Sequence, residues 1–159
     1  MGTTPIRVLL VDDYEPWHRF FSTTLQKKPE LQVVGHALDG PEAVLQAEEM
    51  QPDLILLDIG LPTFNGIEAA RRIRGLSPAS KILFVSENRS AEIAKEALST
   101  GANGYVVKSD AASDLLHAVE AVLQGKWFVS SSLAGHDLEV EANVHNAEIC
   151  AEHSAEYSE

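Results

Sequence analysis

Apolar runs recur along the chain, and each is followed by a segment with helical spacing. The runs cover residues 6–11, 31–38, 53–57, 81–85 and 103–107. Most of them are apolar at nearly every position instead of alternating, which is typical of strands that are covered on both faces of a parallel sheet. Five such strands, each joined to a helix by a short connection, predict a three-layer α/β sandwich with the sheet in the middle.

The segments between the runs carry helix signals. Helices are expected at residues 15–28, 42–50, 65–74, 90–101 and from residue 109 onward. Pro16 suits a first helical turn, where no N–H partner is needed. Asn65 and Glu68 have the spacing of a capping box. Ser90 and Ser109 are the expected caps of the last two helices.

Charge separates the end of the chain from the rest. The net charge is −12, which argues against binding to nucleic acid or to an anionic membrane. Seven acids and no Lys or Arg lie in residues 130–159. This composition predicts a domain at residues 1–129 and a disordered or loosely helical acidic tail at residues 130–159.

Neither a membrane span nor a secretory leader is visible in the sequence. No apolar run approaches the roughly 20 residues that cross a bilayer, and the first residues lack the pattern of a signal peptide. A single cysteine, Cys150, excludes an internal disulfide framework. We therefore expect a cytoplasmic protein.

Chemically active side chains stand at the trailing ends of four of the predicted strands. They are Asp12 and Asp13 after the first strand, Asp58 after the third, Ser86 after the fourth and Lys108 after the fifth. The carboxyl ends of parallel strands meet at one edge of the sheet, which is where open α/β folds bind their ligands. We expect these five side chains to lie near that edge.

Three carboxylates at one edge require a compensating cation. At about 4 Å and an effective dielectric constant near 20, each like-charged pair costs about 4 kcal/mol. Carboxylate oxygens, a backbone carbonyl and waters are the ligands of Mg²⁺, whereas Zn²⁺ would call for His and Cys. An Asp beside such a metal is able to hold a phosphoryl group as an acyl phosphate, with Lys108 neutralising charge and Ser86 donating a hydrogen bond.

The chain resembles the receiver domain of bacterial two-component response regulators. The words that carry the resemblance are V-D-D-Y, L-L-D-I-G-L-P-x-x-N-G, F-V-S and G-Y-V-V-K, and it extends from Ile6 to about Phe128. The resemblance implies a flavodoxin-like, doubly wound five-stranded parallel sheet in the order 2-1-3-4-5, with helices on both faces.

The resemblance also implies a role for each residue of the expected site. Asp58 is the phosphoacceptor, Asp12 and Asp13 hold Mg²⁺ with Asp58 and the Gly60 carbonyl, Ser86 is the switch hydroxyl, Lys108 binds the phosphoryl group, and Tyr105 is the aromatic that follows the switch. Two positions depart from the family pattern. Glu87 follows the switch hydroxyl where a small residue is usual, and Ser109 follows the lysine where proline is frequent.

The leading hypothesis is a signalling module, not an enzyme, that takes a phosphoryl group from a sensor histidine kinase or a phosphotransfer protein. Its output would be a protein contact, with a homodimer through the fourth helix, fifth strand and fifth helix as one form. Residues 125–130 resemble a linker that leads to a helix-turn-helix in one subfamily. No such domain is expected in the acidic tail, so the chain is either a stand-alone receiver or a piece of a longer regulator.

Two other hypotheses belong to different classes. A magnesium-dependent aspartyl-phosphate phosphatase would carry a second acid two residues after its nucleophile, where this chain has Gly60. A receiver-like binding module that no longer takes phosphate is supported only by Glu87. Among the remaining titratable residues, His18, His36 and His117 are expected to be surface or partly packed side chains.

Overall fold

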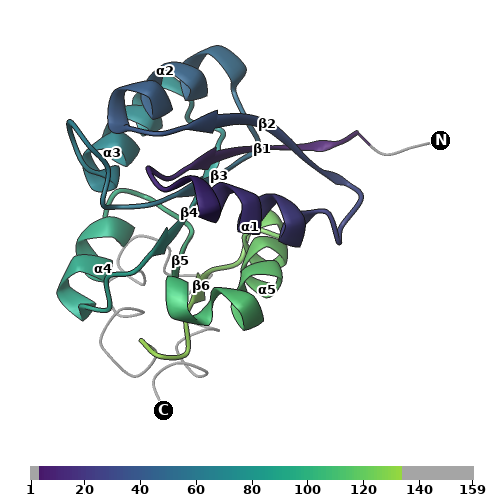
Figure 1. Ribbon diagram of the computed structural model, residues 1–159. Helices are drawn as coiled ribbons and strands as arrows, with labels where there is room; N and C mark the ends of the chain where they lie inside the picture. Colours follow the sequence, from purple (N-terminus) through teal and green to yellow (C-terminus); the bar gives the residue numbers. More distant parts are fainter. Residues whose placement is uncertain (1–3, 134–159) are drawn as a thin grey trace. The chain divides into compact units, whose positions relative to one another are not determined.

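The computed structural model describes residues 4–133, in which strands and helices alternate (Figure 1). The elements are β1 (Ile6–Val11), α1 (Glu15–Leu25), β2 (Leu31–Ala37), α2 (Gly40–Met50), β3 (Leu54–Leu57), α3 (Gly66–Leu76), β4 (Lys81–Ser86), α4 (Ala91–Leu98), β5 (Gly104–Val107), the 3₁₀ helix η1 (Lys108–Asp110), α5 (Ala111–Leu123) and β6 (Phe128–Val129). The strands form one sheet in the order β2-β1-β3-β4-β5-β6. This is the flavodoxin-like α/β fold that the sequence predicts, with one additional strand.

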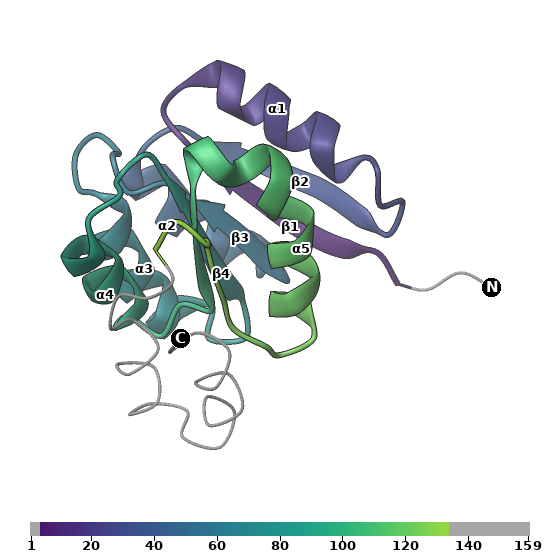
Figure 2. The ribbon, with the colours of Figure 1, turned by 90° about the horizontal axis from the view of Figure 1, so that it is seen from below.

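The fold divides into two compact units, Met1–Ile82 and Leu83–Glu159. In the first unit, β1 pairs in parallel with β2 on one side and β3 on the other. Helix α1 covers one face of these strands, and α2 and α3 pack together on the opposite face (Figures 1 and 2). In the second unit, α4 and α5 contact β5 from opposite sides (Figure 1).

Burial explains why the strand sequences are so apolar. Every residue of β3 and β5 is buried, as are the last four residues of β1. Strand β2 stands at the edge of the sheet, and its pattern mixes exposed Gln32 and His36 with partly buried neighbours. Strands with helices on both faces have no solvated side, whereas the edge strand β2 has exposed positions.

Several element ends differ from the expected ones. Helix α1 ends at Leu25 and α4 at Leu98, three residues before the expected ends. Asn65 and Ser90 cap α3 and α4 through their side chains, as predicted. Ser109 does not cap α5, because the chain first makes the 3₁₀ turn η1 and α5 begins only after Asp110.

The packed structure continues past residue 129. Strand β6 adds to the edge of β5, with Gly104 opposite Phe128 and Tyr105 opposite Val129. Ser130 is fully buried, and its hydroxyl accepts a hydrogen bond of 2.8 Å from the Val107 N–H. The apolar and hydroxyl residues at 127–133 therefore belong to the second unit and not to a tail. The rest of the predicted tail, residues 134–159 with Cys150, lies outside the described residues.

Within residues 4–133, no helix is both long and apolar enough to span a membrane.

Removing the Ser130 hydroxyl tests the contribution of this C-terminal segment. Ser130→Ala leaves the buried Val107 N–H without its acceptor, so we expect a loss of about 1–3 kcal/mol in the free energy of unfolding. Ser132→Ala is the matched control, because Ser132 is exposed and its loss should change stability by less than about 0.5 kcal/mol. Urea unfolding of both variants measures the difference, and equal stabilities would show that the Ser130 contact contributes nothing.

Candidate functional site

The register of β1 and β3 brings two of the predicted acids together. Val11 lies opposite Leu57, so the residues that follow them, Asp12 and Asp58, leave neighbouring strands at the same level. The Asp58 N–H donates to the Val11 carbonyl at 3.1 Å, and the Asp12 N–H donates to the Ala37 carbonyl at the end of β2 at 3.1 Å. Strand pairing thus fixes the backbone of both acids.

Asp12, Asp13 and Asp58 form a cluster at this edge. One carboxylate oxygen of each lies within 4.8 Å of the others. Asp12 is 0% and Asp58 7% exposed, whereas Asp13 is exposed. One oxygen of Asp12 accepts from the Tyr14 N–H at 2.9 Å, and one of Asp58 accepts from the Ile59 N–H at 2.8 Å.

This donor set fits a hard divalent cation. Three carboxylates this close repel one another by about 4 kcal/mol per pair at an effective dielectric constant near 20. Their oxygens are the ligands that Mg²⁺ prefers, and the cluster contains neither of the soft ligands typical of a structural zinc site. Gly60, whose carbonyl is the further predicted ligand, is exposed in the loop just after Asp58.

A tight loop carries the chain from Asp58 into α3. Its backbone is held by the Ile59 carbonyl, which accepts from the N–H groups of Leu61 and Gly66, both at 2.8 Å. A methyl group at Gly66 would overlap the backbone carbonyl of Asp58. Glycine at this position therefore allows the start of α3 to lie directly against the phosphoacceptor candidate.

The remaining predicted residues belong to the second unit. Ser86 ends β4 opposite Val107, and Lys108 follows Val107 at the end of β5. Both side chains are buried. Ser86 and Lys108 thus stand at the carboxyl ends of two neighbouring strands, as the sequence predicts.

Asn88 connects two of the predicted switch residues within the second unit. The Asn88 N–H donates to the Ser86 hydroxyl at 3.1 Å, and the Asn88 carbonyl accepts from the Tyr105 hydroxyl at 2.8 Å. The Tyr105 ring is 0% exposed and packs beside Phe84. Ser86 and Tyr105 are therefore connected by hydrogen bonds through a single residue, Asn88, in the loop between β4 and α4.

A family model for the response regulator receiver domain matches residues 8–120. The chain belongs to the response regulator receiver family. The match includes every residue of the predicted site from Asp12 to Lys108.

The curated relatives of this receiver are named as transcriptional regulatory proteins or as a nitrate/nitrite response regulator. This chain is 33% identical over 133 residues to the transcriptional regulatory protein LnrK of Bacillus subtilis. The aligned residues make up 84% of this chain and 60% of LnrK. The chain is 35% identical to DegU of Brevibacillus brevis and 33% to the nitrate/nitrite response regulator NarL of Escherichia coli, covering 78% and 81% of this chain. The chain spans 52–60% of the length of these relatives.

Solved receivers have the same fold. A LuxR-family two-component response regulator from Aurantimonas superimposes with a TM-score of 0.78 at 31% identity, covering 96% of this chain and 99% of the other. The response regulator domain of Thermotoga maritima CheB gives 0.70 at 33% identity, covering 76% and 97%. These findings confirm the predicted family and fold, and none of them supports the phosphatase alternative. The roles of the individual site residues stay predictions.

The structure adds residues that the sequence patterns did not single out. Gly66 lies against Asp58, Asn88 links Ser86 to Tyr105, and Ser130 holds the backbone just before Lys108. The sequence predicts His18 to be a surface or partly packed side chain, but it is only 2% exposed and bonds to the backbone of Asp12. No short motif marks these contacts, because each joins segments that are brought together only by folding or by a loop of irregular conformation.

Gly66→Ala and Gly75→Ala form a matched pair within α3. The first places a methyl group against the Asp58 carbonyl, so we expect it to destabilise the protein by about 1–3 kcal/mol or more. The second has open space around the new methyl group and should stabilise by up to about 1 kcal/mol through helix propensity. Urea unfolding measures both, and a Gly66→Ala protein as stable as the native one would contradict the close approach.

Proposed function

We propose that this receiver domain takes a phosphoryl group onto Asp58 from the phosphohistidine of a sensor histidine kinase or a phosphotransfer protein. The observation that supports the proposal best is the cluster of Asp12, Asp13 and Asp58 at the ends of β1 and β3. A carboxylate oxygen of Asp58 attacks phosphorus, the phosphorus–nitrogen bond of the donor breaks, and the electron pair returns to the donor imidazole.

Asp12 and Asp13, with Asp58 and the Gly60 carbonyl, would hold Mg²⁺ at this site. The cation supplies compensation for the negative charge of the carboxylates and of the incoming phosphoryl group. The strands hold the backbone of Asp12 and Asp58, so binding of the cation would need no large rearrangement of these two residues. The N–H of Ile59 fixes one oxygen of Asp58 and orients the carboxylate plane.

Lys108 and Ser86 would bind the phosphoryl group once it is on Asp58. Lys108 provides a positive charge from the end of β5, and Ser86 a hydroxyl from the end of β4. Because Asn88 bonds to both Ser86 and Tyr105, a shift of the Ser86 hydroxyl toward phosphate would change the support of the Tyr105 hydroxyl. This network supports a two-state surface built from α4, β5 and α5.

The readout we propose is a protein contact at that surface, with a homodimer as one form. The relatives named as transcriptional regulators are longer than this chain, so their whole activity is not carried over. We place the protein in the cytoplasm of a bacterium, because the proposed kinase partner delivers phosphate there. Direct binding to nucleic acid is not part of the proposal, since the chain carries a net charge of −12.

Phosphorylation of Asp58 is tested with a small phosphodonor and Mg²⁺. We expect the mass of one phosphoryl group to be added to the native protein, to depend on Mg²⁺ and to be released at alkaline pH as an acyl phosphate is. Asp58→Asn should abolish the adduct. Asp53→Asn is the matched control, because Asp53 lies at the opposite end of β3 and should leave the adduct intact. A native protein that forms no adduct contradicts the proposal and favours a binding module that takes no phosphate.

We expect Glu87 to slow the access of an anionic phosphodonor to Asp58. The residue follows Ser86 directly and is exposed. Glu87→Ala removes its negative charge, so we expect phosphorylation by a small anionic donor to accelerate about two- to fivefold at low salt, with the difference shrinking at high salt. Glu120→Gln removes one exposed charge from α5 and controls for net charge. Equal rates in all three proteins would exclude Glu87 as a barrier.

A further inference from the structure

Two histidines connect β2 to the backbone of the metal-binding acids. His18 on α1 is 2% exposed, and its Nε2 lies 2.6 Å from the Asp12 carbonyl oxygen. Its Nδ1 lies 2.8 Å from Nδ1 of His36 on β2. The two rings are 4.9 Å apart between centroids. We call this chain of contacts the His36–His18–Asp12 relay.

The acceptor at the inner end determines the hydrogen positions. A carbonyl oxygen only accepts, so the proton of this bond lies on Nε2 of His18. Only one proton fits between the two Nδ1 atoms at 2.8 Å. In the neutral pair His18 Nδ1 therefore accepts and His36 Nδ1–H donates, and both bonds of the relay point toward Asp12.

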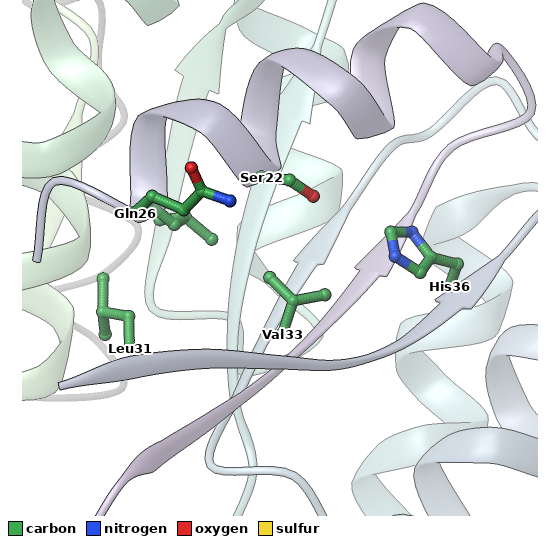
Figure 3. Close-up of a pocket in the computed structure, with 6 residues that line it drawn as sticks. Ser22, Gln26, Leu31, Val33 and His36 are labelled. Atoms are coloured by element: carbon green, nitrogen blue, oxygen red, sulfur yellow. The ribbon is translucent and has the colours of Figure 1, made fainter. Parts of the chain in front are cut away.

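The environment of His36 is consistent with a neutral pair. Although His36 is largely exposed, partial desolvation of its ring, and then the neighbouring His18, lower its pKa below the ordinary value, while nearby Glu15 opposes them. His36 also lines a pocket of about 270 Å³ between α1 and β2, together with Ser22 and Gln26 of the α1 end (Figure 3). The outer end of the relay thus borders a space that a small molecule can enter.

The relay completes a double attachment of Asp12 to the end of β2. The Asp12 N–H bonds directly to the carbonyl of Ala37, the residue after His36. The Asp12 carbonyl is held from the other side through His18. Because both the N–H and the C=O of Asp12 are fixed, the peptide planes that flank its carboxylate have little freedom to rotate.

We propose that His18, supported by His36, is a positioning residue that orients Asp12 for the cation. The proposal rests on the proposed function, because it concerns the same Mg²⁺ site. Hydrogen bonds that orient metal ligands from outside commonly affect affinity by one order of magnitude or more. His18 touches the backbone of a ligand instead of its carboxylate, so a smaller effect of about three- to tenfold is expected.

Two amide variants at His18 separate the contacts. In His18→Gln the side-chain amide reaches the position of Nε2 and keeps a donor for the Asp12 carbonyl. In His18→Asn the shorter amide stays near the position of Nδ1 and loses it. Both variants replace a buried ring by a polar amide, so their losses in stability should be similar, and the difference between them reports on the Asp12 contact.

Two readouts in the full chain test the proposal. The first is Mg²⁺ affinity by calorimetry, which we expect His18→Asn to weaken about three- to tenfold and His18→Gln to leave within about twofold of native. The second is metal-free amide hydrogen exchange at Tyr14, whose N–H bonds to the Asp12 carboxylate at 2.9 Å. Exchange at Tyr14 should accelerate in His18→Asn more than in His18→Gln, whereas a merely structural loss would affect both equally.

His36→Ala supplies a test that does not alter His18. It enlarges the pocket and removes the outer donor, so added imidazole should restore the slow exchange at Tyr14, and ¹⁵N spectra of native His18 should show hydrogen on Nε2. Equal Mg²⁺ affinity and equal Tyr14 exchange in the Asn and Gln variants would overturn the proposal. If the native protein binds no Mg²⁺, the proposed function fails, while the metal-free exchange still decides on the relay.

Discussion

Like-charge crowding at the ends of β1 and β3 is the constraint on which the rest of this receiver depends. Asp12 and Asp58 are almost fully buried. One carboxylate oxygen of each lies within 4.8 Å of the other and of a carboxylate oxygen of Asp13. Carboxylates at this spacing resist folding unless their charge is compensated, because burial removes the water that would screen them. The apolar strands offset that cost, and the same crowding makes the site receptive to a cation.

Backbone hydrogen bonds hold the crowded acids in defined positions. The carbonyls of Val11 and Ala37 fix the acids from neighbouring strands, and Gly66 lets α3 begin directly against Asp58. The second unit uses the same device, since Asn88 joins Ser86 to Tyr105 and Ser130 holds the N–H just before Lys108. In each case a residue outside the expected site holds a predicted residue, through backbone groups at Val11, Ala37 and Asn88, through a hydroxyl at Ser130 and through the missing side chain at Gly66.

The family resemblance and the structure explain different parts of the molecule. The five apolar runs and the acids that end them are visible in the sequence because strand burial imposes composition. The helix cap at Asn65 was predictable because its hydrogen bonds are local. Ser109 does not cap a helix as predicted, because it lies within a 3₁₀ turn that the spacing of residues in the sequence does not indicate. Strand β6 is two residues long and pairs with β5 from outside, so it leaves almost no periodic signal.

The sequence by itself determined the α/β class, the strand positions, the family and the acids, because these follow from hydrophobic pattern and from short motifs whose residues are close in the chain. Only the tertiary structure decided which side chains support them. His18 and His36 are 18 residues apart and carry no motif, yet folding places their Nδ1 atoms 2.8 Å apart. Side-chain contacts between α1 and β2 depend on how a helix lies on a strand, and local sequence does not encode that geometry.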